Sequence, residues 1–209
     1  MKVSGRLLIV AASFLILIGG GLVLFSLQEM YSQEKKTKDS LIHAQKIIQN
    51  EKNKESKNVL QTEHPIDISF DQGEAIGILK IPRLKAELPI IEGTDEDELE
   101  KGVGHYSTTV FPGQPDQILL SGHRDTVFRS LGELEIGDIF LVSMPYGEFT
   151  YEITDSKIVD AGDTTVIRST APHEILTVST CYPFSFVGNA PSRYILNAKR
   201  IQIEIGGGD

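Results

Sequence analysis

The sequence predicts a mainly β domain, either a barrel or a sandwich, that follows an apolar N-terminal segment and a polar connecting region. Seven short runs rich in β-branched and aromatic residues follow one another between residues 75 and 205, separated by Gly, Pro, Asp and Asn. Helical periodicity in this region is confined to short segments. Since 40% of the 209 residues are hydrophobic, one compact core is expected. These observations fix the fold class and leave the strand topology open.

The first element is a candidate membrane span. Residues 7–27 form 21 consecutive positions without a charged side chain. At about 1.5 Å per residue, a helix of this length matches a hydrocarbon core about 30 Å thick. A secretory signal peptide would have a shorter apolar stretch and then small residues, whereas the polar pair Gln28 and Glu29 follows here. We therefore expect residues 1–27 to form a cytoplasmic flank and an uncleaved, single-pass transmembrane anchor in the cell membrane.

The orientation of this anchor is not decided by charge alone. Lys2 and Arg6 precede the span, and three lysines follow it within the distance that influences topology. The short N-terminal flank favours an N-terminus inside the cell and the bulk of the chain outside, because translocation of a large domain depends little on its own charge.

The second element, residues 28–73, is rich in Gln, Lys, Glu, Asn and Ser. Its few apolar residues, such as Leu41, Ala44 and Ile48, fit one amphipathic helical stretch and cannot build a core. We expect a polar, partly helical stalk.

The third element, residues 74–205, holds the strands. A short helix is expected at Asp95–Gly102, which has acidic residues early and Lys and Gly late, and a helical turn around Phe128–Leu134. Residues 206–209 are expected to form a flexible C-terminus. The expected strands are Ala75–Ile81, Ala86–Glu92, Gln117–Ser121, Ile139–Pro145, Phe149–Val159, Glu174–Thr180 and Arg193–Ile205.

Charge and cysteine content exclude some classes of function. The formal net charge is −9, and beyond residue 27 the chain carries 18 basic residues (20 less Lys2 and Arg6) against 29 acidic ones. Nucleic acid is therefore not expected as a partner. Cys181 is the single cysteine, so no intrachain disulfide can form.

Cys181 is the first candidate for chemistry. It follows the β-branched run Glu174–Thr180 and precedes Tyr182-Pro183, which should end the strand. A rigid scaffold can present a thiol at such a strand end to a substrate, where it can act as a nucleophile. A buried cysteine acting as a small hydrophobic residue is the other interpretation.

His123 occupies an equivalent position, because the apolar run Gln117–Leu120 predicts a strand that ends just before it. A Cys–His pair is useful because the imidazole can take the thiol proton and later protonate a leaving amine. Without the cysteine, a satisfied surface or core histidine would be the ordinary interpretation.

Arg193 opens the last long strand, after the loop 188–192. A guanidinium stays charged at any working pH and offers a rigid fork of donors, so it suits an oxyanion in a partly desolvated cleft. From its position alone, a surface charge at the start of a strand is the default interpretation.

Other titratable residues are assigned lesser roles. His105 and His173 are expected in packing or turn positions, and Asp125 could orient the ring of His123. The acidic cluster Asp95–Glu98 lacks the ligand pattern and fixed glycine of an EF-hand loop, which favours a solvated helix face. Since the chain also has no phosphate-cradling glycine loop and no CxxC, we expect neither a metal nor a cofactor.

Three segments taken together resemble the sortase family. Leu120–Thr126 has the sequence LSGHRDT, Thr177–Cys181 has the sequence TVSTC, and Arg193 lies twelve residues beyond the cysteine. The family's TLxTC signature has Val178 here in place of the usual Leu, which is a conservative change. The similarity extends over about residues 75–205 and includes the segments Gly77–Pro82 and Gly102–Tyr106.

The resemblance implies an eight-stranded sortase β-barrel on the outside of a Gram-positive cell. It implies a cysteine transpeptidase that cleaves an LPxTG-like sorting signal between Thr and Gly. Cys181 would be the nucleophile that forms a thioacyl intermediate, His123 the general acid and base, and Arg193 the stabiliser of the oxyanion. The partners would be sorting-signal peptides of surface proteins and an amine from a peptidoglycan precursor or another protein.

Within the family, the sequence favours the class D type, with the housekeeping class A as second choice. No second apolar span and no DPF or DPW lid motif is found, which argues against the pilin-polymerising class. The connection 160–173 lacks the long helix of the haem-acquisition class.

Two competing interpretations remain open. An L,D-transpeptidase of peptidoglycan is also a Cys–His enzyme, but it carries Gly before the cysteine and Arg soon after, which TVSTCYPF does not. A non-catalytic, membrane-anchored β-domain for wall or surface binding would instead have a buried and inert Cys181.

Overall fold

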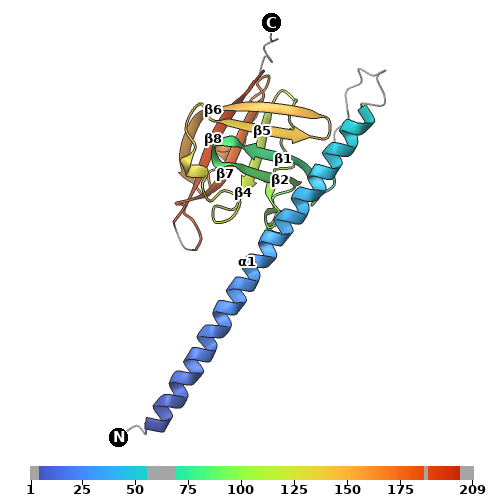
Figure 1. Ribbon diagram of the computed structural model, residues 1–209. Helices are drawn as coiled ribbons and strands as arrows, with labels where there is room; N and C mark the ends of the chain where they lie inside the picture. Colours follow the sequence, from blue (N-terminus) through green and yellow to red (C-terminus); the bar gives the residue numbers. More distant parts are fainter. Residues whose placement is uncertain (1–4, 56–68, 186–187, 203–209) are drawn as a thin grey trace. The chain divides into compact units, whose positions relative to one another are not determined.

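The computed structural model describes residues 5–55, 69–185 and 188–202, in which a long helix, α1 (Gly5–Glu55), precedes a β domain (Figure 1). Within this part of the chain, the segment Ala12–Asn53 is long and apolar enough to cross a membrane. Its most apolar window has a mean hydropathy of 1.7, and none of that window is buried. Leu17 and Val23, for example, are exposed. Apolar side chains left in contact with solvent indicate a membrane anchor.

The β domain is a closed barrel, so the expected mainly β class and eight-stranded barrel are confirmed. The described strands follow one another around the barrel in the order β1-β2-β3-β4-β7-β8-β6-β5, and the pairing of β5 with β1 closes it. Closure leaves no unpaired sheet edge. The strands are β1 (Ala75–Ile81), β2 (Ala86–Glu92), β3 (Val103–His105), β4 (Gln117–Gly122), β5 (Ile139–Met144), β6 (Gly147–Asp160), β7 (Ile175–Tyr182) and β8 (Ser192–Ile201).

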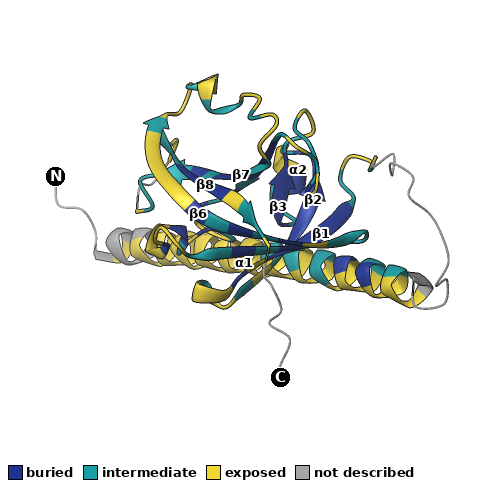
Figure 2. Ribbon diagram, turned by 90° about the horizontal axis from the view of Figure 1, so that it is seen from above, coloured by how far each residue is buried: buried dark blue, intermediate teal, exposed yellow. Residues whose placement is uncertain are grey.

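The barrel interior is filled by apolar side chains that alternate along the strands. In β5, every second residue is buried, as expected when successive side chains point to opposite faces of a sheet. Phe140, Tyr151 and Leu79 are fully buried in this core. Much of β1, β2 and β3 is correspondingly dark blue in Figure 2. The core thus provides a rigid frame from which strand ends present side chains.

Most predicted elements are found, with one strand missed. β1 and β2 have the predicted bounds, and α2 (Glu96–Leu99) lies within the helix expected at Asp95–Gly102. β3 was not predicted, because three residues that include Gly104 carry no alternating pattern. Short 3₁₀ turns lie at Pro82–Leu84, Leu131–Glu133 and Thr164–Val166, and the second falls within the expected turn at Phe128–Leu134.

The segment expected to be a stalk contains the second half of α1. From Thr37 onward, Ala44 and Ile48 are buried, and they cluster with Ala75, Ile78 and Ile91 of the barrel. The apolar residues that the sequence analysis assigned to an amphipathic stretch therefore have apolar neighbours. The function of residues 28–73 as a stalk stays a prediction, and its segment 56–68 lies outside the described residues, as does the C-terminus 206–209.

Asp116 ties the connection between β6 and β7 to the start of β4. Its Oδ1 accepts hydrogen bonds from the backbone N–H groups of Thr170 (2.6 Å), Gln117 (2.8 Å) and Ala171 (3.1 Å). Its Oδ2 accepts one from Ser169 Oγ at 3.0 Å. The N–H of Thr170, followed by that of Gln117, lowers the pKa of Asp116 because hydrogen bonds favour the charged carboxylate.

Asp116→Asn is therefore expected to lower the melting temperature near neutral pH. Because the folded-state pKa is below the unfolded value of about 3.9, the charged group stabilises the fold above that value and loses this effect as the pH falls through the folded pKa. The difference in melting temperature between wild type and variant should shrink as the pH is lowered below about 4. Thermal melting by circular dichroism at several pH values measures it. A difference that is constant down to the acid limit would contradict this role.

Candidate active site

The site begins with the parallel pairing of β4 and β7. Their register aligns Gly122 with Thr180, so His123, which directly follows β4, and Cys181 of β7 come to the same level at the same end of the two strands. Inward-facing residues of β7 include Leu176, Val178 and Thr180, all buried. Cys181 follows Thr180 and therefore points to the outer face of the barrel. Its thiol is free and partly exposed, which the interpretation as a buried bystander did not predict.

Arg193, on β8, lies beside Cys181. In the antiparallel pair of β7 and β8, Cys181 and Arg193 lie directly opposite each other. Side chains at such positions share a face, with Cβ atoms about 5 Å apart. The Arg193 guanidinium donates through Nη1 to the carbonyls of Ser192 at 3.0 Å and Ala190 at 3.3 Å. Among the described residues no carboxylate lies within 4.0 Å of it to neutralise its charge.

One cavity of about 280 Å³ is lined by all three predicted residues. His123, Cys181 and Arg193 come from three neighbouring strands, and the loop after β7 contributes Gly188, Asn189 and Ala190. The arrangement offers a thiol nucleophile, a titratable ring and a fixed positive charge around one space, which is what acyl transfer requires.

The ring of His123 has one nitrogen without a hydrogen bond in the described residues. Nε2 is buried and lies 3.5 Å from Glu96 Oε1, but the contact does not meet the geometry of a hydrogen bond. Glu96 is 75% exposed, so solvent weakens its attraction for the ring. Nε2 therefore remains available to exchange a proton with a bound molecule.

Two residues at the site were missed by the sequence analysis. Glu96 belongs to α2, in the acidic cluster interpreted as a solvated helix face, and its sequence distance from His123 gave no signal of proximity. Asp125, which was considered as the partner of the ring, lines the cavity, but the carboxylate near the ring belongs to Glu96. Arg124 also lines the cavity and is 9% exposed. It stands within the motif LSGHRDT but had been given no role.

The other two histidines considered do not line this cavity. His105 is 1% exposed, and its Nδ1 lies 2.6 Å from Oε2 of the buried Glu92. It is a packing residue of β3, as expected, and also a member of a buried polar pair. His173 lies on the connection that precedes β7.

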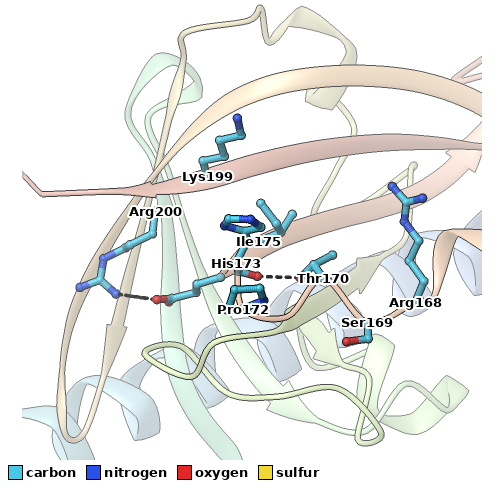
Figure 3. Close-up of a pocket in the computed structure, with 9 residues that line it drawn as sticks. Arg168, Ser169, Thr170, Pro172, His173, Ile175, Lys199 and Arg200 are labelled. Atoms are coloured by element: carbon cyan, nitrogen blue, oxygen red, sulfur yellow. Dashed lines mark hydrogen bonds and ion pairs between the residues drawn. The ribbon is translucent and has the colours of Figure 1, made fainter.

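A larger cavity of about 570 Å³ lies at the opposite end of β7 and β8 (Figure 3). Four basic residues line it: Arg168, His173, Lys199 and Arg200. It begins near Ile175, and the six residues from there to Cys181 span about 20 Å of strand. Despite its size, this cavity is remote from the candidate nucleophile.

Glu174, the carboxylate that lines the larger cavity, stabilises the fold. Glu174 Oε1 accepts hydrogen bonds from Tyr151 Oη at 2.5 Å, from the backbone N–H of Gly113 at 2.8 Å and from Arg200 Nη1 at 3.2 Å. Burial, followed by the hydrogen bond to Glu174, raises the pKa of Tyr151 far above its ordinary value. The tyrosine stays protonated and the carboxylate is saturated with donors, so neither is suited to proton transfer.

Among the described residues no group of three or more His, Cys, Asp or Glu side chains is arranged to hold a metal ion.

The chain is similar in sequence to known sortases. The sequence pattern of the sortase domain matches residues 79–201. Sortase D of Bacillus subtilis (strain 168) is 47% identical over 202 residues, which cover 96% of this chain and all of the relative. Sortase A of Bacillus anthracis is 24% identical over 185 residues, covering 84% of this chain and 87% of the relative.

Solved structures agree in fold. The Clostridium perfringens sortase D5 transpeptidase superposes with a TM-score of 0.65 at 25% identity, and the match covers 80% of this chain and 99% of that structure. A Clostridium perfringens sortase C, solved with a C-terminal cell wall sorting motif, gives a TM-score of 0.60 at 24% identity. That match covers 79% of this chain and 89% of the other, and at this identity it bears on the fold alone.

Proposed function

This chain belongs to the sortase family of cysteine transpeptidases, and from this membership we propose that it cleaves an LPxTG-like sorting signal of surface proteins between Thr and Gly. We further propose that it transfers the protein to an amine of the cell wall or of another protein. The observation that supports this is the register of β4, β7 and β8, by which His123, Cys181 and Arg193 line one cavity.

In the first half of the reaction, Cys181 Sγ, whose thiol proton has passed to His123, attacks the carbonyl carbon of the substrate Thr. The C–S bond forms as the carbonyl oxygen takes the negative charge, and the Arg193 guanidinium stabilises that oxyanion. His123 donates a proton to the Gly nitrogen as the C–N bond breaks, so the C-terminal fragment leaves as an amine. The product is a thioacyl enzyme.

In the second half, an acceptor amine attacks the thioester carbon. His123, now without its proton, takes one from the attacking nitrogen, and the C–S bond breaks to release the Cys181 sulfur. Arg193 stabilises the second oxyanion as it did the first. Water could resolve the same thioester, so the ratio of transfer to hydrolysis reports how well the acceptor is bound.

The class D assignment agrees with the relatives. Identity to Sortase D is 47% over nearly the whole chain, against 24% to Sortase A of Bacillus anthracis. The choice made from the sequence, class D ahead of the housekeeping class, is therefore supported.

We also propose that the N-terminus lies inside the cell and the barrel outside, where sorting signals and wall amines are found. Cys181 offers the test because it is the single cysteine of the chain. A thiol reagent that cannot cross membranes should label it in intact cells. Labelling that needs cell lysis would contradict this orientation.

The proposed function can be tested on the full chain in detergent micelles. A panel of quenched LPxTG-type peptides, varied at the third and fifth positions, is incubated with an amine acceptor, and products are identified by mass spectrometry. We expect cleavage at the Thr–Gly bond, product joined to the amine, and a peptide adduct that maps to Cys181 when the amine is omitted. Peptides with Thr and Gly exchanged serve as controls and should remain intact.

If no panel peptide is cleaved and Cys181 reacts with a small alkylating reagent only after unfolding, the proposed function is wrong. The chain would then be a non-catalytic, membrane-anchored β-domain, the alternative considered from the sequence. Cleavage without any adduct on Cys181 would contradict the proposed nucleophile instead.

A further inference from the structure

Arg124 is a buried charged side chain next to His123 that the proposed mechanism does not use. It is 9% exposed. Burial of a guanidinium is costly unless its donors are occupied. Its Nη1 donates to the carbonyl of Pro183 at 3.1 Å and its Nη2 to the carbonyl of Gly188 at 2.8 Å. A charge held in this way, with two donors on two backbone oxygens, restrains whatever segment carries those oxygens.

The segment restrained is the loop between Cys181 and Arg193. Pro183 comes two residues after the cysteine, and Gly188 comes five residues before the arginine. The carbonyls that Arg124 holds therefore lie at the start of the loop that joins β7 to β8 and just past its middle. Gly188, Asn189 and Ala190 of that loop line the catalytic cavity.

Arg193 depends on the same loop. Its Nη1 donates to the carbonyl of Ala190, two residues beyond the carbonyl of Gly188 that Arg124 holds. A path of hydrogen bonds thus runs from the segment of His123, through Arg124 and the loop, to the guanidinium that faces the oxyanion. A shift of the loop would move the Arg193 guanidinium relative to Cys181, although both strands kept their pairing.

We propose that Arg124 is a positioning residue of transpeptidation, which fixes Pro183 and residues 188–190 so that Arg193 is held against the oxyanion. This inference rests on the proposed function. Arginine suits the position because its planar fork holds two N–H groups in fixed directions toward separate carbonyls, whereas lysine offers a compact ammonium on a flexible stem without that fixed geometry. The proposal assigns Arg124 no contact with the substrate.

The test compares Arg124→Lys and Arg124→Met with wild type in the full chain, on the peptide that wild type cleaves best. Misplacement of a catalytic group by about 1 Å can cost about 10²-fold in rate, so we expect kcat to fall about 10- to 100-fold for both variants. KM should change much less, because Arg124 is assigned no contact with the substrate and the strands of the barrel keep their pairing. The rate at which a small reagent alkylates Cys181 should be unchanged, since the nucleophile itself is intact.

Arg129→Lys is the matched control. Arg129 lies on the same loop after β4, and its guanidinium also donates to a backbone carbonyl, that of Asp125 at 3.0 Å from Nε. It does not line the catalytic cavity. Its variant should keep the kcat of wild type. Amide hydrogen exchange at residues 188–190 should rise in the Arg124 variants and stay unchanged in this control.

Several outcomes would overturn the inference. The first is an Arg124→Lys variant with the kcat of wild type. The second is a fall in kcat that is matched by an equal fall in the rate of Cys181 alkylation, or that is fully explained by the fraction of unfolded protein. If wild type cleaves no peptide, both the proposed function and this inference are wrong. If wild type and both Arg124 variants cleave equally well, only the inference fails.

Discussion

Replacement of Cys181 by alanine is expected to lower kcat/KM for a sorting-signal peptide by at least about 10⁴-fold, because no other group can form the thioacyl intermediate. Cys181 is the single cysteine, so the chain holds no second thiol that could substitute. The side chain is partly exposed and lines the cavity with His123 and Arg193, so its loss should leave the core intact. Peptide cleavage and transfer, followed by mass spectrometry, measure the effect.

Cys181→Ser is the matched control for shape. It keeps the size of the side chain and replaces the thiol by a far weaker nucleophile, so it should be nearly as inactive as the alanine variant while melting like wild type. His123→Ala is expected to lower kcat by about 10²- to 10⁴-fold, the usual contribution of a general acid and base. Substantial transfer activity in Cys181→Ala would show that the reaction takes place elsewhere or by another route.

Replacement of His105 by alanine is expected to lower the free energy of unfolding of the barrel by about 3–5 kcal/mol, because it leaves a buried carboxyl group without its partner. Glu92 is 5% exposed, and its Oε2 lies 2.6 Å from His105 Nδ1. The pair joins β2 to β3, where the two residues are in register. Urea unfolding of the full chain in detergent, followed by near-ultraviolet circular dichroism, measures the change.

Hydrogen bonding shows that a proton occupies the contact between His105 and Glu92. The hydroxyl of Thr109 donates to the carbonyl of Tyr106, so it can only accept from His105 Nε2, and the carbonyl of Val110 can also only accept. His105 Nε2 therefore carries a hydrogen. The Nδ1 to Oε2 contact then needs a second proton, whichever of the two groups holds it.

A double variant with leucine at both Glu92 and His105 separates this pair from simple packing. Replacing both partners by apolar groups leaves no unpaired carboxyl group, so the double variant should be more stable than His105→Ala. A loss of less than about 1 kcal/mol in His105→Ala would mean that the pair contributes little and that the carboxyl group finds water or another partner.

The missed strand and the correct ones differ in how much local signal they contain. β1 and β2 were predicted with their observed bounds because each is a run of β-branched and apolar residues bounded by turn residues. β3 has three residues, and its central Gly104 leaves room for the backbone of Gly93, which a Cβ would meet at 2.4 Å. Such a strand forms because β2 and β4 pair with it on its two sides. No pattern in the local sequence identifies those two partner strands.

In the candidate site, too, some features follow from local sequence and others only from the tertiary structure. The sequence by itself determined the mainly β class and predicted the membrane anchor and the candidate reactive residues at strand ends, because hydrophobic runs and turn residues act over short distances along the chain. Only the tertiary structure decided that β4 and β7 run parallel, that His123 and Cys181 are level, and that Glu96 and Arg124 belong to the site. These residues meet across as many as 64 positions of sequence, as Arg124 and Gly188 do through a hydrogen bond. Such contacts form only when the whole barrel closes, so no short stretch of sequence specifies them.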